Sequence, residues 1–205
     1  ALDPAVVEWR CPAEVTAMQA LDDGYRLTLN DASTLDCDLA VLAEGGRSGL
    51  REQLGITVQT TPYRQTALIA NITPADAHAG QAFERFTEDG PMALLPLPEN
   101  RCALVWTRSG KDAERLLQLA DREFLAELQQ AFGYRLGALK QVGSRHLYPL
   151  QLIEASEQVR PHLVLLGNAA HSLHPIAGQG YNLSLRDALC LAETLLESQA
   201  SLGDF

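Results

Sequence analysis

The sequence predicts an α/β fold in which a nucleotide-binding sheet is interrupted by an inserted domain of strands and helix. Two short apolar runs, residues 38–43 and 162–167, each lead into glycine and polar residues. Runs that are apolar on both faces are typical of buried parallel strands. Strand patterns and a helical pattern lie between them, so a second domain divides the first.

The first zone, residues 1–56, is predicted to form part of the nucleotide-binding domain. Residues 14–20 and 25–29 look like paired strands, and Asp22-Asp23-Gly24 between them is a turn sequence. The buried run 38–43 follows and ends at Glu44, Gly45 and Gly46. Ligands of open α/β sheets bind beyond the carboxyl ends of strands, so this end is a candidate binding edge.

The middle zone, residues 57–155, is predicted to be an inserted α+β substrate-binding domain. A helix is expected over residues 116–132, where apolar residues recur at helical spacing. Gly90-Pro91 and Glu99-Asn100 supply turns. The expected strands are residues 66–72, 82–86, 92–97 and 102–107.

The third zone, residues 156–205, is predicted to return to the nucleotide-binding domain. A strand at 162–167 is followed by a loop of small residues and then by a helix over about 182–198. The apolar face of this helix consists of Leu185, Ala188, Leu189, Ala192, Leu195 and Leu196.

Composition excludes several classes of function. The 26 acidic residues outnumber the 16 basic ones and give a net charge of -10, which argues against nucleic acid as a partner. The four cysteines show no metal-like spacing and no disulfide framework, so we expect reduced thiols in a cytoplasmic protein. The sequence holds neither an apolar run of membrane-spanning length nor a signal peptide.

The segment around the last strand carries the strongest chemical signal. A buried strand ends at Gly167, and Asn168 then presents a short polar side chain at the ligand edge. Gly178-Gln179-Gly180 allows close backbone approach to a ligand just before a helix, whose free N–H groups favour negative charge. The alternative interpretation is a structural strand–loop–helix in which the glycines serve tight contacts.

This segment resembles the second FAD motif of the flavoprotein monooxygenases related to para-hydroxybenzoate hydroxylase. That motif reads Gly-Asp-Ala-Ala-His, then Pro, Gly-x-Gly-x-Asn and a helix with Asp-Ala. Asn168 replaces the Asp that bonds the ribityl hydroxyls of FAD, and so loses a charge-assisted bond. The resemblance implies a cofactor site that comprises Gly167, Asn168, Pro175, Gly178, Gln179, Gly180 and Asn182.

The segment from Cys37 to Arg51 resembles a second motif of the same family, Ala-Asp-Gly-x-x-Ser-x-x-Arg, which is linked there to FAD and NAD(P)H. The resemblance adds Glu44 and Gly45 to the expected cofactor site, with Glu44 in place of the family's Asp. Arg47 and Arg51 stand close enough in sequence to meet a phosphate or to pair with Glu44. The alternative interpretation is a surface ion pair that follows a strand.

Residues 81–106 resemble the substrate-domain sheet of the ubiquinone-biosynthesis hydroxylases. Within that family the sequence is similar to the 2-polyprenyl-6-methoxyphenol hydroxylase branch, which an Asn at position 168 fits. The likeness covers nearly the whole chain. It implies a partial FAD-binding, Rossmann-like domain of the glutathione-reductase type, and a monooxygenase that uses NAD(P)H and O2 on a polyprenyl phenol. It also implies access to the inner-membrane surface, and a homo-oligomer or contacts with other ubiquinone-biosynthesis proteins.

Two rival functions stay open at this point: a non-catalytic flavin-fold accessory protein, favoured by the altered acids Glu44 and Asn168, and another flavin oxidoreductase of the same fold. No catalytic residue is assigned, although His146 and Tyr148 could activate a phenol. No metal is expected at the His-x-x-His pair of His171 and His174, because Pro175 breaks a helix there and no third ligand is suitably spaced.

The glycine-rich turn that holds the pyrophosphate in Rossmann-type sites is not found in the sequence, because no Gly-x-Gly-x-x-Gly precedes Glu44. The chain therefore resembles the middle-to-late portion of these enzymes. We expect it to bind FAD weakly by itself and, with one apolar sheet edge uncovered, to self-associate.

Overall fold

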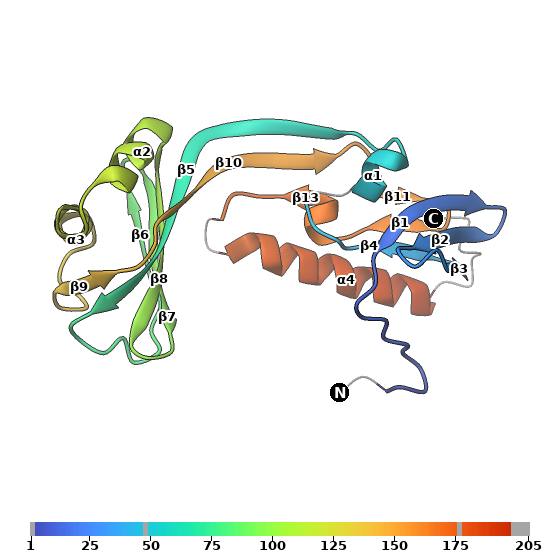
Figure 1. Cartoon of the computed structure of the whole chain (residues 1–205), viewed down its shortest axis with the longest axis horizontal. Helices are drawn as coiled ribbons and strands as arrows, with labels where there is room; N and C mark the ends of the chain where they lie inside the picture. The colour runs from blue at the N-terminus through green and yellow to red at the C-terminus, as the bar shows by residue number, and fades with distance from the viewer. Residues whose placement is uncertain (1–2, 47–48, 176–177, 198–205) are drawn as a thin grey trace. The chain divides into compact units, whose positions relative to one another are not determined.

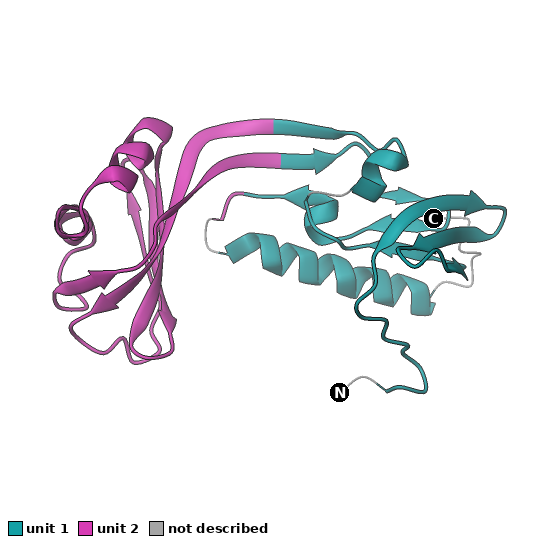
Figure 2. Ribbon diagram, viewed as in Figure 1, with its two compact units in different colours: residues 1–60, 153–173, 178–205 teal, residues 61–152, 174–177 magenta. Residues whose placement is uncertain are grey.

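A computed structural model describes residues 3–46, 49–175 and 178–197 of the chain. The chain divides into two compact units, which are described separately (Figure 2). Unit 1 comprises residues 1–60, 153–173 and 178–205, and unit 2 comprises residues 61–152 and 174–177. The element order agrees with the predicted plan, in which a sheet-and-helix unit interrupts an α/β unit (Figure 1).

Unit 1 contains two small sheets, a short helix α1 and the long helix α4. The antiparallel hairpin predicted at the start of the chain is present, with its turn at Asp22-Asp23, and a further strand extends it. The helices are α1 (Gly49–Gln53) and α4 (Gln179–Glu197), and the strands are β1 (Val15–Leu21), β2 (Gly24–Leu29), β3 (Thr34–Cys37), β4 (Ala40–Leu42), β11 (Val159–Arg160), β12 (Leu163–Leu165) and β13 (His171–Ser172).

The two apolar runs of the sequence form adjacent parallel strands in unit 1. β12 pairs with β4 in register, Leu163 opposite Ala40 and Leu165 opposite Leu42, and β11 lies on the other side of β12. Leu42, Leu163 and Leu165 are buried in one core. The prediction of buried parallel strands is therefore confirmed for both runs.

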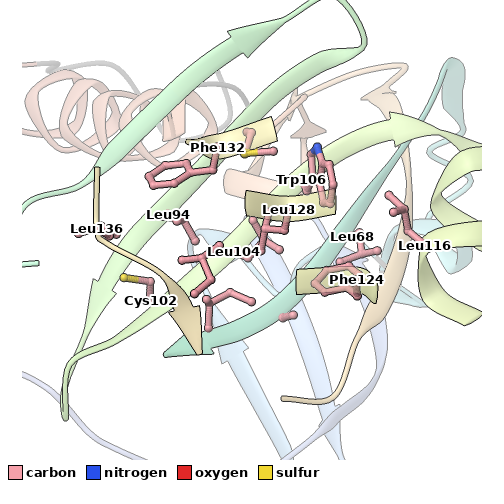
Figure 3. Close-up of a cluster of buried hydrophobic side chains, with 14 residues drawn as sticks. Leu68, Leu94, Cys102, Leu104, Trp106, Leu116, Phe124, Leu128, Phe132 and Leu136 are labelled. Atoms are coloured by element: carbon pink, nitrogen blue, oxygen red, sulfur yellow. The ribbon is translucent and has the colours of Figure 1, made fainter. Parts of the chain in front are cut away.

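Unit 2 is an antiparallel sheet covered by two helices. Its elements are β5 (Val58–Pro74), β6 (Phe83–Thr87), β7 (Gly90–Leu97), β8 (Arg101–Ser109), α2 (Gly110–Gln118), α3 (Asp121–Phe132), β9 (Leu139–Val142) and β10 (His146–Ala155), of which β5 and β10 each continue into unit 1. Along β8, Cys102, Leu104 and Trp106 are buried because alternate side chains point to one face of a strand. They face the side chains of Phe124 and Leu128 on α3 (Figure 3).

The single helix expected over residues 116–132 is in fact two helices. Leu119 and Ala120 both adopt extended backbone angles, so α2 ends at Gln118 and α3 begins at Asp121. The carboxylate of Glu123 accepts the Ala120 N–H at 3.3 Å and thereby caps the new helix. The break allows Leu116 on α2 and Phe124 on α3 to reach the same core.

α4 begins at Gln179 instead of near residue 182, and residue 198 of the expected helix lies outside the described part. None of its described residues is buried. The predicted apolar face is open: Leu185, Leu189 and Leu196 are exposed. No described helix is long and apolar enough to cross a membrane.

Candidate functional site

Two loops of unit 1 meet at the carboxyl ends of the parallel strands. Glu44, Gly45 and Gly46 follow β4, and a 3₁₀ turn η1 (Gly167–Ala169) follows β12. A methyl group placed on Gly46 would lie 3.6 Å from the carbonyl oxygen of Asn168, so the two backbones are neighbours. Since ligands of α/β sheets bind at this edge, the loops form one candidate site.

Arg51 on α1 holds these two loops together. The side chain is only 3% exposed, and its Nη1 donates to the carbonyl oxygen of Ala169 at 2.7 Å while Nη2 donates to that of Gly46 at 3.2 Å. Nη1 and Nη2 thus donate to backbone carbonyls of the two loops, and a contact of Arg51 with a phosphate, one of the two partners expected for it, stays a prediction. Arg47, predicted with it, lies outside the described residues.

Asn168 occupies the exposed tip of the β12 loop. Gly167 before it has a φ of +61°, a left-handed conformation that glycine adopts without steric cost. The Asn168 side chain makes no hydrogen bond to any residue that the structure describes, so its amide is available to a ligand. An amide both donates and accepts, which suits a sugar-alcohol hydroxyl.

The glycine motif forms the start of α4. Gly178 has a φ of +63°, and a Cβ added to Gly178 or Gly180 would meet no described atom within 4 Å. Gln179, Gly180 and Asn182 lie in the first turn of a 19-residue helix, where free N–H groups and the helix dipole favour negative charge. No acidic side chain in that turn opposes this effect.

Within unit 1, α4 lies close to the β12 loop and to β13, as two pairs of residues show. A Cβ on Gly167 would lie 3.7 Å from the hydroxyl of Ser184, which itself donates to the Gly180 carbonyl at 2.9 Å. His171 on β13 places Nε2 3.0 Å from a carboxylate oxygen of Asp187. This His–Asp pair was not predicted from the sequence, although both residues belong to the quoted motif and lie 16 positions apart.

The structure thus brings together eight of the nine predicted cofactor residues in unit 1, while Pro175 is grouped with unit 2. Glu44 and Gly45 lie on the β4 loop, Gly167 and Asn168 on the β12 loop, and the others at the start of α4. Of the two histidines considered for a metal, His171 pairs with Asp187 and His174 with Gln65. No group of three His, Cys, Asp or Glu residues gathers within the described ranges.

Comparison with known proteins identifies the family. The model of a family described as FAD binding domain matches residues 5–200, nearly the whole chain. The chain belongs to this FAD-binding family. The resemblance drawn from the motifs is thereby confirmed, and so is the expectation of FAD as the family's cofactor.

Similar proteins point to hydroxylases. The chain is 44% identical over 188 residues to ubiquinone hydroxylase UbiL of Rhodospirillum rubrum, covering 92% of this chain and 44% of that protein. It is 32% identical to 3-demethoxyubiquinol 3-hydroxylase of Escherichia coli, covering 95% of this chain and 49% of that protein. The chain therefore spans about half the length of these relatives.

Solved structures share the fold. PqsL of Pseudomonas aeruginosa, described as a probable FAD-dependent monooxygenase, superposes with a TM-score of 0.72 at 25% identity, over 94% of this chain and 56% of that one. The flavin-dependent halogenase CmlS superposes with a TM-score of 0.70 at 22% identity, over 88% of this chain and 35% of that one. These likenesses confirm the predicted partial FAD-binding α/β fold.

The residues of the site fit one end of FAD. A free amide at Asn168, open space beside Gly178 and Gly180, and a helix N-terminus match a ribityl chain and a flavin ring that gains negative charge on reduction. Binding residues for the pyrophosphate of FAD are not found in the same way, because the sequence holds no Gly-x-Gly-x-x-Gly turn. The chemistry of the described residues therefore suits the flavin half of FAD, and their role in binding it stays a prediction.

Proposed function

We propose that the gene product carrying these 205 residues is an FAD-dependent monooxygenase that hydroxylates a polyprenylated phenol in ubiquinone biosynthesis. The overall reaction converts an aromatic C–H to C–OH with O2, NAD(P)H and a proton, and releases NAD(P)⁺ and water. The observation that carries this proposal is the convergence of Asn168 and the glycine loop on the carboxyl edge of two parallel strands, in a chain whose relatives include ubiquinone hydroxylases.

The cofactor supplies the oxygen chemistry, and the chain's residues supply its binding and environment. In this proposal the Asn168 amide bonds a ribityl hydroxyl, and Glu44 and Gly45 line the same edge. The backbone from Gly178 through the first turn of α4 stabilises negative charge on the ring. By its place in the motif, Pro175 would shape the wall beside the ring.

The domain assignment belongs to the same proposal. Residues 1–56 and 156–205 would form the FAD-binding domain and residues 57–155 the substrate-binding domain. The boundaries of the compact units, after residues 60 and 152, lie close to these positions. Unit 2 offers hollows of several hundred Å³, one of about 400 Å³ lined by Phe83, Phe132 and Arg135.

The polyprenyl tail of such a substrate implies work at the inner-membrane surface by an otherwise cytoplasmic protein. The exposed apolar face of α4, with Leu185, Leu189 and Leu196, supports self-association or contact with other ubiquinone-biosynthesis proteins.

The test is a balance of reactants and products. Purified gene product with FAD, NADH or NADPH, 18O2 and a short-chain prenylphenol should yield phenol that carries one 18O atom. Consumption of NAD(P)H without incorporated oxygen would favour another flavin oxidoreductase of the same fold. A protein that neither binds FAD nor consumes NAD(P)H would favour the non-catalytic accessory role, for which the altered acids Glu44 and Asn168 are the motive.

A further inference from the structure

A pocket of about 400 Å³ in unit 2 lies where the end strand β6 of the sheet meets the end of α3. The rings of Phe83 on β6 and Phe132 on α3 form an apolar part of its wall; they meet edge to face, with centroids 6.0 Å apart and planes at 89°. Two guanidinium groups line the same space. The residues around the pocket are Ala82, Phe83, Glu84, Arg85, Phe132 and Arg135.

Arg85 is held beside this pocket by one of its three nitrogen atoms. Its Nη1 donates to the carbonyl oxygen of Phe132 at 3.2 Å. Phe132 is the last residue of α3, where the helix dipole favours a cation. The Nε and Nη2 atoms, which form the other edge of the planar group, have no hydrogen-bond partner in the part of the chain that the structure describes.

The Nε–Nη2 edge is the part of arginine that binds carboxylates elsewhere in this chain. Arg26 donates from Nε and Nη2 to the two oxygens of Asp36 at 2.7 and 2.6 Å, and Arg160 uses the same two atoms for Glu157. Two parallel bonds match the planar carboxylate and are stronger than bonds between neutral groups. Arg85 presents the same edge, and no carboxylate of the described residues fills it.

The charges around the pocket also favour an anion. The side chain of Arg135 forms no hydrogen bond or ion pair with any described residue, so a second cation lines the space without a counter-ion. Glu84 is the acidic residue of the lining, but successive side chains of a strand point to opposite faces, so its carboxylate leaves β6 on the side away from Arg85. Two like charges at one pocket repel each other, and an anion between them relieves that repulsion.

We propose that this pocket is a binding site for an organic carboxylate with an apolar body. The free edge of Arg85 holds the carboxylate through two parallel bonds, Arg135 adds a second positive charge, and the rings of Phe83 and Phe132 contact the hydrocarbon. Inorganic anions lack the apolar part, and neutral hydrocarbons lack the charge. The site lies within unit 2 and needs no flavin, so it does not depend on the proposed function.

The first experiment titrates the chain with octanoate and follows backbone amide signals by NMR. Signals of Phe83, Arg85 and Gly133 should shift until they saturate, with a dissociation constant on the order of 1–10 mM, as usual for a ligand of this size. Octanamide has the same shape without the charge, and acetate has the charge without the apolar body; both should bind on the order of tenfold more weakly. Equal binding of octanamide or of inorganic phosphate, or an absence of shifts at the three amides, would overturn the proposal.

The second experiment repeats the octanoate titration with arginine variants. Arg85→Lys keeps the charge but lacks the planar fork, and should weaken binding on the order of tenfold. Arg135→Gln removes an exposed charge and should weaken binding about threefold, with little effect on the melting temperature. Arg122→Gln, at an exposed arginine of α3 that does not line the pocket, is the matched control and should bind octanoate as the parent does.

Unchanged affinity in Arg85→Lys, or an equal loss in Arg122→Gln, would show that octanoate does not use the Arg85 edge and would overturn the proposal. If Arg85→Lys does not fold, Arg135→Gln decides the matter, because its exposed side chain makes no hydrogen bond within the described structure. Unchanged affinity in a folded Arg135→Gln protein would then overturn the proposal.

Discussion

Replacing Arg51 tests whether the site depends on the contact between its two loops. Arg51→Met keeps helix propensity and most of the apolar stem, and removes both hydrogen bonds from the guanidinium to the Gly46 and Ala169 carbonyls. Hydrogen bonds from charged donors contribute about 1.5–3 kcal/mol each. Loss of both is offset in part because a cation no longer has to be buried, so we expect a net destabilisation of roughly 2–4 kcal/mol.

The assay is urea and thermal unfolding of the chain, with Arg186→Met as the control because Arg186 is an exposed arginine on α4 of the same unit. In a chain of this size each 1 kcal/mol lowers the midpoint by about 2–4 °C, so a fall on the order of 5–10 °C is expected for Arg51→Met. A difference of less than about 0.5 kcal/mol from Arg186→Met, within the usual range for surface substitutions, would refute the role given to Arg51.

Three further predictions concern the cofactor and the exposed surface. In the complete gene product, Asn168→Asp should bind FAD at least as tightly as the parent, since a carboxylate adds a charge-assisted bond worth about 1 kcal/mol; weaker binding in a fluorescence titration would contradict the placement of Asn168. In the complete gene product, Gly180→Val should abolish NAD(P)H-dependent turnover while circular dichroism shows a folded protein. Gly178→Val should do the same, with an added cost of about 1–2 kcal/mol in folding stability at its positive φ; normal turnover of either variant would show that the loop is not part of the site. The chain alone should elute as a dimer or larger and should retain far less than one FAD per chain after desalting; Leu189→Lys should shift its mass toward the monomer, and an unchanged mass would show that α4 does not mediate association.

The sequence predicted those parts of the fold in which one local pattern decides the outcome. The runs at 38–43 and 162–167 are apolar on both faces, and they form the parallel pair β4 and β12. The strands of unit 2 could be predicted because side chains alternate between the two faces of a strand. On β5, for example, every second side chain from Leu68 through Ala70 to Ile72 is buried. The motif residues that follow β4 and β12 also lie close together as predicted, because the carboxyl ends of parallel strands lie at one edge of a sheet.

The sequence did not predict contacts that join residues distant in the chain. Arg51 was expected to meet a phosphate or to pair with Glu44, because only residues near it in the sequence could be considered, whereas the Ala169 carbonyl that it bonds lies 118 residues away. Gln65 and His174 are 109 residues apart, and neither is part of a spacing pattern. The α2–α3 break was overlooked for a local reason: Asp121 and Glu123 mark the first turn of a new helix inside a continuous apolar periodicity.

Two exposed surfaces of unit 1, the free edge of β4 and the apolar face of α4, bear on the cofactor site, which could be predicted less fully than the fold. β4 is the end strand of its sheet, so the backbone groups that point away from β12 have no strand partner among the described residues, and Val41 on it is 42% exposed. The apolar face of α4 is open as well, with Leu189 56% exposed. A further strand and helix are the elements that cover such an edge and such a face in α/β folds, and the relatives are about twice as long as this chain. The same elements carry the pyrophosphate turn in Rossmann-type sites. A protein in which a further strand and helix cover these two surfaces should therefore also bind FAD more tightly than this chain alone.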